Sequence, residues 1–274
     1  MGVMSMSTIC KTTHRGINVG PWCRWGATIL VGVLGFSLSA SAVRAESVFL
    51  VADNHPDLES FFTLDFGELG GVTSAVITNT RFVLDIDAKA GTARFVEYHQ
   101  DIEPLILPGG ISTGDITIEI VEGSSSGTFD PKTNEYMTTE LYLIFFTEDL
   151  SLFGVESPLI LESTSNGILN MDSNVTGTIA MAWEGGSELQ NPGDPKNPIE
   201  FTYTCTVNSQ FAQAGTGDFN ADDHVNFEDY LELRECFVEH LDSPVGSACA
   251  AGDFDVDGDI DFDDVAAFRS VYGS

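Results

Sequence analysis

Positively charged side chains are scarce in this sequence. The chain of 274 residues holds 11 Lys and Arg against 42 Asp and Glu, which gives a formal net charge of −31 at pH 7. A surface with this charge repels nucleic acid and anionic lipid, and it attracts cations. The composition therefore excludes nucleic acid as an expected partner and favours a protein that binds metal ions.

A zinc-peptidase motif and helical periodicity are both lacking between residues 46 and 211. No H-E-x-x-H motif occurs, and the histidines of this region, His55 and His99, are expected to be ordinary surface or strand residues. Glutamates are so numerous that choosing two of them as glycosidase carboxylates would be arbitrary. Trp183 is expected to be a core residue rather than a platform that stacks on a sugar. The region therefore predicts no particular reaction.

What the region does contain is a series of segments typical of strands. About ten runs, such as SVFLVA, RFVLDID and EFTYTCTV, are rich in β-branched and aromatic residues. Turn residues separate them, for example Gly70-Gly71 and Pro108-Gly109-Gly110. Short strands at this spacing predict a mainly β domain over residues 46–211, built as an antiparallel β-sandwich or jelly roll.

The first 45 residues have the features of an export signal. Three basic residues precede an apolar run at 27–42: Lys11, Arg15 and Arg24. Residues 43–45, Val-Arg-Ala, fit the small-x-small cleavage rule, and residues 40–42 offer a second cleavage point. The apolar run is shorter than the ~18 residues of a membrane-spanning helix, so a cleaved signal peptide at 1–45 is favoured over a retained anchor. We therefore expect a secreted or cell-surface protein with no membrane span after processing.

Removal of the signal changes the charge and the cysteine content. The mature chain holds seven Lys and Arg against 42 Asp and Glu, a net charge of −35. Its cysteines are Cys205, Cys236 and Cys249. Disulfides persist in exported proteins, and Cys236 and Cys249 lie in the same C-terminal segment, so these two are the expected pair. Cys205 is left over, either as a buried small apolar residue or as a free thiol.

The C-terminal segment is an internal duplication. After a linker of small residues at 212–216, GDFNADDHVNFEDYLELRECF (217–237) aligns with GDFDVDGDIDFDDVAAFRSVY (252–272) at a constant offset of 35 residues. Two carboxylates about 5 Å apart repel each other by roughly 1 to 3 kcal/mol, depending on the dielectric. Because this repulsion requires a compensating cation, residues 217–274 are expected to form a separate metal-binding module.

Each copy fits a twelve-residue calcium loop, D-x-[DN]-x-[DN]-G-x-x-x-x-x-E, with Asp in the last position. Two Ca²⁺ ions are therefore expected, each held by side-chain oxygens, one carbonyl and one water-bridged side chain. The first set is Asp218, Asn220, Asp222, the carbonyl of His224, Asn226 through water, and Asp229. The second set is Asp253, Asp255, Asp257, the carbonyl of Asp259, Asp261 through water, and Asp264. Val225 and Ile260, in the eighth loop position, are expected to pair the two loops through a short β contact.

A helical pattern follows each loop, whereas the preceding segments, NSQFAQAGTG and SPVGSACAAG, are typical of loops. An EF-hand requires a helix on both sides of its loop. A duplicated unit of loop and single helix resembles the dockerin type I module, a small calcium-folded domain that docks onto cohesin domains. The resemblance covers roughly residues 216–274. The alternatives are a solvated acidic tail, which the matched aromatic residues disfavour, and thrombospondin-like calcium repeats, which contain far less helix between loops.

The resemblance implies a partner-binding surface at loop positions ten and eleven and along the following helix. These positions hold Phe227, Glu228, Arg234, Phe262, Asp263 and Arg269. They are not the hydroxyl pairs of the best-known dockerins, which leaves the identity of a cohesin-like or cell-surface partner open. Burial of the two phenylalanines in the module core is the alternative. A further departure is Asp223, which stands where the first loop should have glycine and predicts a weaker first site.

Together these features predict an exported calcium-binding protein. Its dockerin-like module would dock a β-sandwich domain, with a binding or structural role, onto a surface partner. The alternative is a dockerin-bearing glycoside hydrolase, or another enzyme of polysaccharide catabolism, in which case a polysaccharide is a partner as well.

Overall fold

The computed structural model describes residues 47–107, 109–147, 157–191, 194, 196–239 and 244–274. The predicted signal peptide, residues 1–45, lies outside these ranges. Within them, no helix has the length and apolar character needed to cross a membrane.

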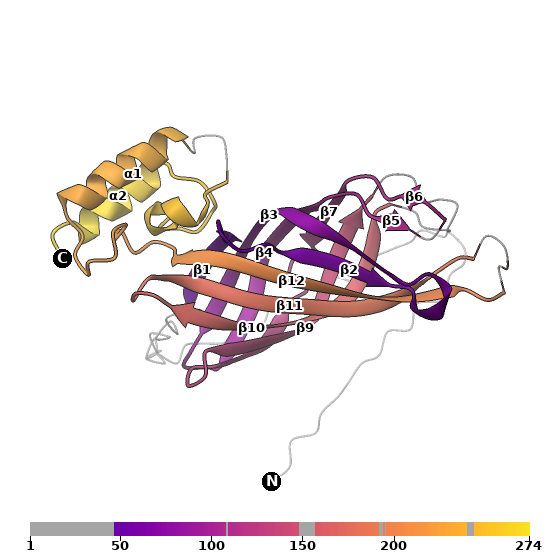
Figure 1. The fold of residues 1–274 in the computed structure, drawn as a ribbon. Helices are drawn as coiled ribbons and strands as arrows, with labels where there is room; N and C mark the ends of the chain where they lie inside the picture. Colours follow the sequence, from indigo (N-terminus) through magenta and orange to yellow (C-terminus); the bar gives the residue numbers. More distant parts are fainter. Residues whose placement is uncertain (1–46, 108, 148–156, 192–193, 195, 240–243) are drawn as a thin grey trace, which may run out of the picture. The chain divides into compact units, whose positions relative to one another are not determined.

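Antiparallel strands make up most of the described chain (Figure 1). The strands are β1 (Val48–Asn54), β2 (Phe61–Asp65), β3 (Val72–Asp87), β4 (Thr92–Ile102), β5 (Ile106–Leu107), β6 (Ile111–Ser112), β7 (Ile116–Ile120), β8 (Ser126–Asp130), β9 (Glu135–Phe146), β10 (Leu159–Met171), β11 (Thr176–Leu189) and β12 (Ile199–Gln213). A short 3₁₀ helix, η1 (Gly67–Leu69), follows β2. β5 and β6 pair only with each other, and the other ten strands belong to one sheet. The prediction of a mainly β, antiparallel domain is confirmed.

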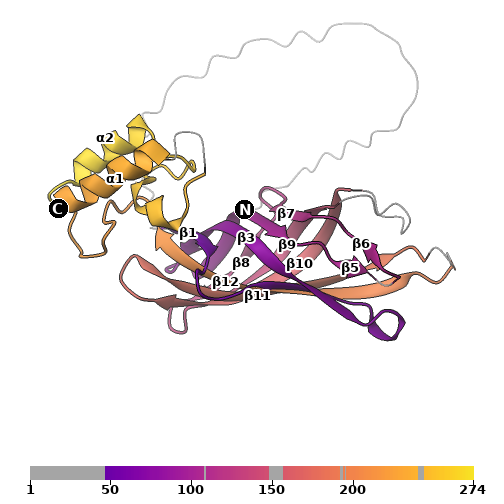
Figure 2. The ribbon, with the colours of Figure 1, turned by 45° about the horizontal axis from the view of Figure 1, so that its top comes forward.

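The ten-stranded sheet closes on itself. β1 and β2 occupy successive halves of one position, since both pair with β12 on one side and with β3 on the other. β7 and β8 share the position between β4 and β9 in the same way. The ten strands therefore fill eight positions of a ring, in which each position pairs with the next and β12 returns to the position shared by β1 and β2. The strands wrap around a common interior in Figure 2.

The predicted sandwich or jelly roll therefore differs from the structure, which has one closed sheet in place of two stacked ones. Both architectures bury one face of every strand, so an alternation of apolar and polar residues fits either. Strand order decides between them. The closing contact places Leu50 of β1 opposite Gln213 of β12, and local sequence does not encode a pairing of such long range.

Aromatic and aliphatic side chains fill the interior of the ring. Trp183 is fully buried, and its ring centroid lies 5.7 Å from that of Phe62 and 5.8 Å from that of Tyr203. The indole Nε1 donates a hydrogen bond of 2.7 Å to the hydroxyl of Tyr98. Aromatic side chains that bury about 150–250 Å² each dominate the energetics of such a core. Trp183 is therefore a core residue, as predicted, and the free Cys205 is buried in the same core.

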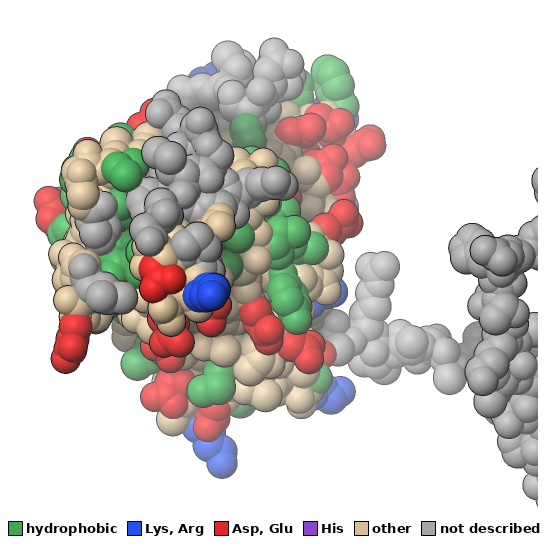
Figure 3. All heavy atoms as spheres, turned by 90° about the vertical axis from the view of Figure 1, so that its right-hand side faces the viewer, with side chains coloured by type: hydrophobic (Ala, Val, Ile, Leu, Met, Phe, Trp, Pro, Cys, Tyr) green, Lys and Arg blue, Asp and Glu red, His purple; other side chains and the backbone are tan. Residues whose placement is uncertain are grey.

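The surface of the closed sheet carries far more carboxylates than cations. Figure 3 shows Asp and Glu side chains spread over one face, with few Lys and Arg side chains between them. Two of the arginines form ion pairs between β3 and β4: Arg81 with Glu97, and Arg94 with Asp85 at 2.8 Å. The sheet surface thus has the character that the composition predicts.

The chain after β12 forms a helical module with a small core of its own. It contains α1 (Phe227–Glu239), the 3₁₀ helix η3 (Ser247–Gly252) and α2 (Phe262–Val271). Its buried apolar residues are Val225, Leu233, Cys236, Val245, Cys249, Ile260 and Phe268. Cys236 and Cys249, the predicted pair, form a disulfide. The two predicted helices are present, whereas SPVGSACAAG, expected to be a loop, contains η3 directly before the second predicted calcium loop.

Candidate metal centres

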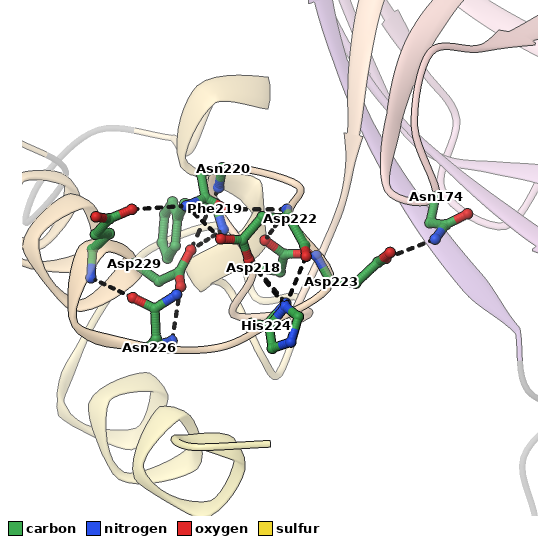
Figure 4. Close-up of polar contacts among 10 residues, drawn as sticks. Asn174, Asp218, Phe219, Asn220, Asp222, Asp223, His224, Asn226 and Asp229 are labelled. Atoms are coloured by element: carbon green, nitrogen blue, oxygen red, sulfur yellow. Dashed lines mark hydrogen bonds and ion pairs between the residues drawn. The ribbon is translucent and has the colours of Figure 1, made fainter.

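The first predicted calcium loop folds around two buried carboxylates, Asp218 and Asp229 (Figure 4). Asp229, in the first turn of α1, accepts hydrogen bonds from the backbone N–H groups of Phe219 and Asn226, both at 2.8 Å. Asp218 accepts one from the N–H of Asp223 at 2.9 Å. Since these bonds point inward from both sides, the loop backbone bends around the carboxylates that begin and end the predicted ligand set.

The second loop repeats this arrangement. Asp264 accepts hydrogen bonds from the N–H groups of Phe254 at 2.7 Å and Asp261 at 2.8 Å, and Asp253 accepts one from the N–H of Gly258 at 3.2 Å. Every one of these residues lies 35 positions after its counterpart in the first loop. Asp253 and Asp264 are each 1% exposed. The duplication of sequence is therefore also a duplication of hydrogen-bond geometry.

Asp253 has an oxygen that no described residue satisfies. Its Oδ1 atom is buried and makes no hydrogen bond within the described part of the chain. A buried carboxylate oxygen without a partner is costly, and a bound cation would remove that cost. Burial, followed by the neighbouring carboxylate of Asp264, raises the pKa of Asp253 from 3.8 to about 6. A proton and a metal ion are therefore alternative ways to neutralise this side chain.

The other carboxylates of the second loop gather beside Asp253. In each of two groups, one oxygen from every member lies within 4.8 Å of the others: Asp253, Asp255 and Asp257, and Asp259, Asp261 and Asp264. Burial and the neighbouring Asp257 raise the pKa of Asp255. A set of oxygen donors without nitrogen or sulfur suits hard cations such as Ca²⁺ and Mg²⁺. The structure thus brings the six aspartates of the predicted second set together as two groups of three, with the carboxylate of Asp259, not its predicted carbonyl, in the second group.

The first loop has a weaker set of donors. Asn220 and Asn226 supply neutral amides where the second loop has aspartates, and the Asn220 amide donates to Asp222 at 3.3 Å. His224 is exposed, and only its carbonyl belongs to the predicted ligand set. A hydrogen bond with the backbone of Asp222 and the charge of its carboxylate raise the pKa of His224. Fewer charged oxygens imply weaker attraction for a divalent cation in this loop.

Both loops adopt left-handed backbone conformations at the same two positions. At the sixth position φ is +66° for Asp223 and +91° for Gly258, and at the fourth it is +58° for Ala221 and +60° for Val256. Only glycine adopts this region without a steric penalty, and a β-branched residue there is unusual. The sequence pattern predicted the sixth position. It gave no signal for the fourth, because neither alanine nor valine marks a left-handed turn.

The expected β contact between Val225 and Ile260 takes a different form. The backbone N–H of Val225 donates to the carbonyl of Ser274 at 3.4 Å, and its carbonyl accepts from the N–H of Gly273 at 2.7 Å. The side chains of Val225 and Ile260 share the module core. Residues 273–274 thus lie beside the first loop, where the loop-to-loop ladder was expected.

The residues of the predicted partner-binding surface are exposed. Phe227 and Phe262 are 60% and 77% exposed, which excludes the alternative that they belong to the core. The polar members of the set are exposed as well: Glu228, Arg234, Asp263 and Arg269. Phe227 stacks on the half-exposed Tyr230 with ring centroids 6.1 Å apart. Helices α1 and α2 therefore each present an aromatic ring and an arginine to solvent.

The closed sheet carries two segments with the G-x-S-x-G spacing of a serine nucleophile, residues 110–114 and 123–127. That motif works at a sharp turn from a strand into a helix, and these segments lead into β7 and β8 instead. Ser125 is buried and accepts a hydrogen bond from the N–H of Phe95 at 3.0 Å. His99 lies 3.3 Å from Asp101. Within the described chain, no hydrogen bond joins His99 to a serine of either segment.

Comparison with known proteins leaves the chain without a family assignment. No protein-family model matches the sequence, and no curated protein is significantly similar to it.

Proposed function

We propose that residues 217–274 bind two Ca²⁺ ions, one in each loop. The observation that carries this proposal is the pair of equivalent loops folded around buried carboxylates, with the Oδ1 atom of Asp253 left without a partner. Buried like charges are stable only when a cation or a proton neutralises them. Ca²⁺ is favoured over Mg²⁺, because the loops offer many flexible oxygen donors and Mg²⁺ requires a strict octahedron with several waters.

Calorimetric titration of the mature chain, residues 46–274, tests this proposal. After treatment with a chelator, the chain should bind two Ca²⁺ ions, and Asp253→Ala should abolish the tighter site. Asp218→Ala should abolish the weaker site and leave the tighter one intact. The exposed Asp57, outside both loops, gives the matched control Asp57→Ala. Absence of calcium uptake, or equal loss in all three variants, would contradict the assignment.

We further propose that the module is a dockerin-type domain, which binds an exported protein to a partner protein. The exposed aromatic rings and arginines of α1 and α2 support this, since aromatic residues and Arg are enriched at the centres of protein interfaces. The closed sheet would then be the domain that the module attaches to the partner, and it would have a binding or structural role. The export signal at 1–45 and the disulfide between Cys236 and Cys249 are consistent with a location outside the cytoplasm.

A pull-down from the secreted and envelope fractions of the native host tests docking. The calcium-loaded chain should retain a protein that chelator releases, and Arg234→Ala with Arg269→Ala should retain less of it. The matched control, Lys89→Ala with Lys132→Ala, removes the same charge from exposed sites on the sheet. Retention that is insensitive to both chelator and the arginine variant would argue against docking. A screen for glycan hydrolysis tests the enzymatic alternative, which no geometry of the described residues favours.

A further inference from the structure

One apolar row on the outer face of the closed sheet is covered by the helical module. Val51 of β1 lies between Val83 of β3 and Ala212 of β12 in the strand register. These three side chains alternate with interior residues such as Leu50, yet they are only 1%, 3% and 9% exposed. They are buried because Ala250 of η3 packs against them. The sheet and η3 therefore share an apolar contact outside the ring.

The chain between β12 and the first loop is bound to the same 3₁₀ helix. β12 extends to Gln213, so the linker predicted at 212–216 begins within a strand. The N–H of Gly215 then donates to the carbonyl of Ala250 at 3.1 Å. A linker with these contacts holds the module against the sheet.

Asp53, near the end of β1, binds the beginning of η3. One carboxylate oxygen accepts a hydrogen bond from the N–H of Ser247 at 2.7 Å, and the other accepts one from the Ser247 hydroxyl at 2.7 Å. The N–H groups of the first helical turn have no partner within the helix, and a carboxylate at that end is stabilising. Ser247 is 6% exposed, so water competes little for these bonds.

Arg81 of β3 connects the sheet to the second calcium loop. It pairs with Glu97, and its Nε donates to the carbonyl of Val245 at 3.0 Å. The N–H of Val245 donates in turn to the carbonyl of Gly258, the sixth residue of the loop, at 2.9 Å. A Cβ atom at Gly258 would lie 3.6 Å from Nη2 of Arg81. The turn of the second loop is therefore held from the sheet through the fully buried Val245.

The first loop also contacts the sheet at its sixth position. The side-chain amide of Asn174, in the turn between β10 and β11, donates to Asp223 at 2.7 Å (Figure 4). Asp223 and Gly258 are equivalent residues, 35 positions apart. The sheet thus contacts both loops at the turn around which their ligands converge.

We propose that the helical module docks onto the closed sheet of the same chain through Asp53 and Arg81. We further infer that this docking and calcium binding in the second loop stabilise each other. This inference rests on the proposed calcium function. Docking fixes the backbone at the Gly258 carbonyl, so less conformational freedom is lost when the ion binds. Because coupling between two binding events is reciprocal, the bound ion in turn favours the docked arrangement.

A charge-neutral variant of the mature chain tests the coupling. Arg81→Met with Glu97→Gln removes the bond to Val245 without changing the net charge, which would itself alter calcium affinity. The matched control, Arg94→Met with Asp85→Asn, removes the other ion pair between β3 and β4. In calorimetric titration, the first variant should bind one of the two ions about 5-fold more weakly, the size of one lost hydrogen bond. The control should match the unmodified chain.

Hydrogen exchange of the calcium-loaded chains supplies a second readout. The amides of Val245 and Ser247 should exchange faster in the Arg81→Met, Glu97→Gln variant than in the control, while strands β9 to β12 keep their protection. Asp53→Asn, which leaves the strand pairing intact, should have the same effect at Ser247. Equal calcium affinities and equal exchange in all chains would overturn the inference. An unmodified chain that takes up no calcium would instead overturn the proposed function, so the two failures are distinguishable.

Discussion

The closed sheet and the helical module bury different kinds of side chain. Among the residues that the structure describes, the sheet surrounds a core of 33 buried residues, nearly all aromatic or aliphatic. The core of the module contains seven, two of them joined as a disulfide. The described part of the module also buries four aspartates: Asp218, Asp229, Asp253 and Asp264. A segment of this size with so small an apolar core needs additional stabilisation, such as a metal ion or a disulfide. We therefore expect the sheet to fold by itself, and the module to depend for its stability on the disulfide and on the ions that we propose it binds.

Removal of calcium by a chelator should give the largest difference in stability between the closed sheet and the module. Without calcium the buried carboxylates of the module repel one another, so α1 and α2 should lose their hydrogen-exchange protection while the strands keep theirs. Exchange measured by mass spectrometry on the mature chain, with and without chelator, checks this. Added calcium should restore protection. Helices that remain protected in chelator would show that the module does not need the metal.

Trp183→Ala should have the opposite effect, destabilising the sheet and leaving the module intact. Removing a fully buried tryptophan from the ring should destabilise the sheet by about 3–5 kcal/mol, with two calcium ions still bound at low temperature. Chemical denaturation, followed by circular dichroism of the strands, measures the change. Phe227→Ala, at a site that is 60% exposed, is the control and should cost less than about 0.5 kcal/mol. Similar costs for both variants would contradict the assignment of the core.

The stability and calcium affinity of the module should depend on pH through Asp253, a residue that the sheet lacks. The pKa of Asp253 in the folded chain without metal is raised to about 6 from 3.8, so its protonated form stabilises that state below about pH 4, and this stabilisation is lost as the pH rises through about 6. Calcium must displace the same proton, so calcium affinity should fall as the pH drops from 7 to 5. Titrations at both pH values test this. In Asp253→Asn the pH dependence should be smaller, and an unchanged profile would count against Asp253 as a ligand.

The smallest effect is expected within the module, between its two loops. Asp223→Gly relieves a left-handed aspartate, at φ +66°, but also removes its hydrogen bond with Asn174. The first site should therefore strengthen by less than about 1 kcal/mol. The reciprocal change, Gly258→Asp, should weaken the second site by a similar amount. Competition with a chromogenic chelator resolves differences of this size. If neither change alters affinity, backbone strain does not explain the difference between the loops.

The two acidic loops and their convergent carboxylates could be predicted from the sequence because their determinants are local. The spacing of Asp253, Asp257 and Asp264 fixes which side chains can converge, and the carboxylates, glycine and following apolar residues all lie within a short window. Closure of the sheet could not be predicted, because it depends on which distant strands pair. The strand alternation is the same in a sandwich and in a ring.

One sequence feature indicates that the module covers the sheet, and strand alternation alone does not explain it. Residues 48–52 are apolar at consecutive positions, and Val51 faces away from the ring interior while Leu50 faces into it. A strand that is apolar on both faces is usually covered on both faces. The contacts of Asp53 and Arg81 had no such signal, because a single charged residue at the end of a strand is typical of any surface.

The pairing of β1 with β12 also sets the order in which the chain can fold. Leu50 and Gln213 are partners, so the ring can close only after almost the entire β region has been synthesised. Contacts of such long range slow folding, because the entropy of ordering the chain is lost before the pairing is gained. The module follows directly, and Ala250 packs on Val51 and Ala212, one from each strand of that last junction. Docking of η3 therefore opposes reopening of the ring where it closes, which should lengthen the lifetime of the folded protein.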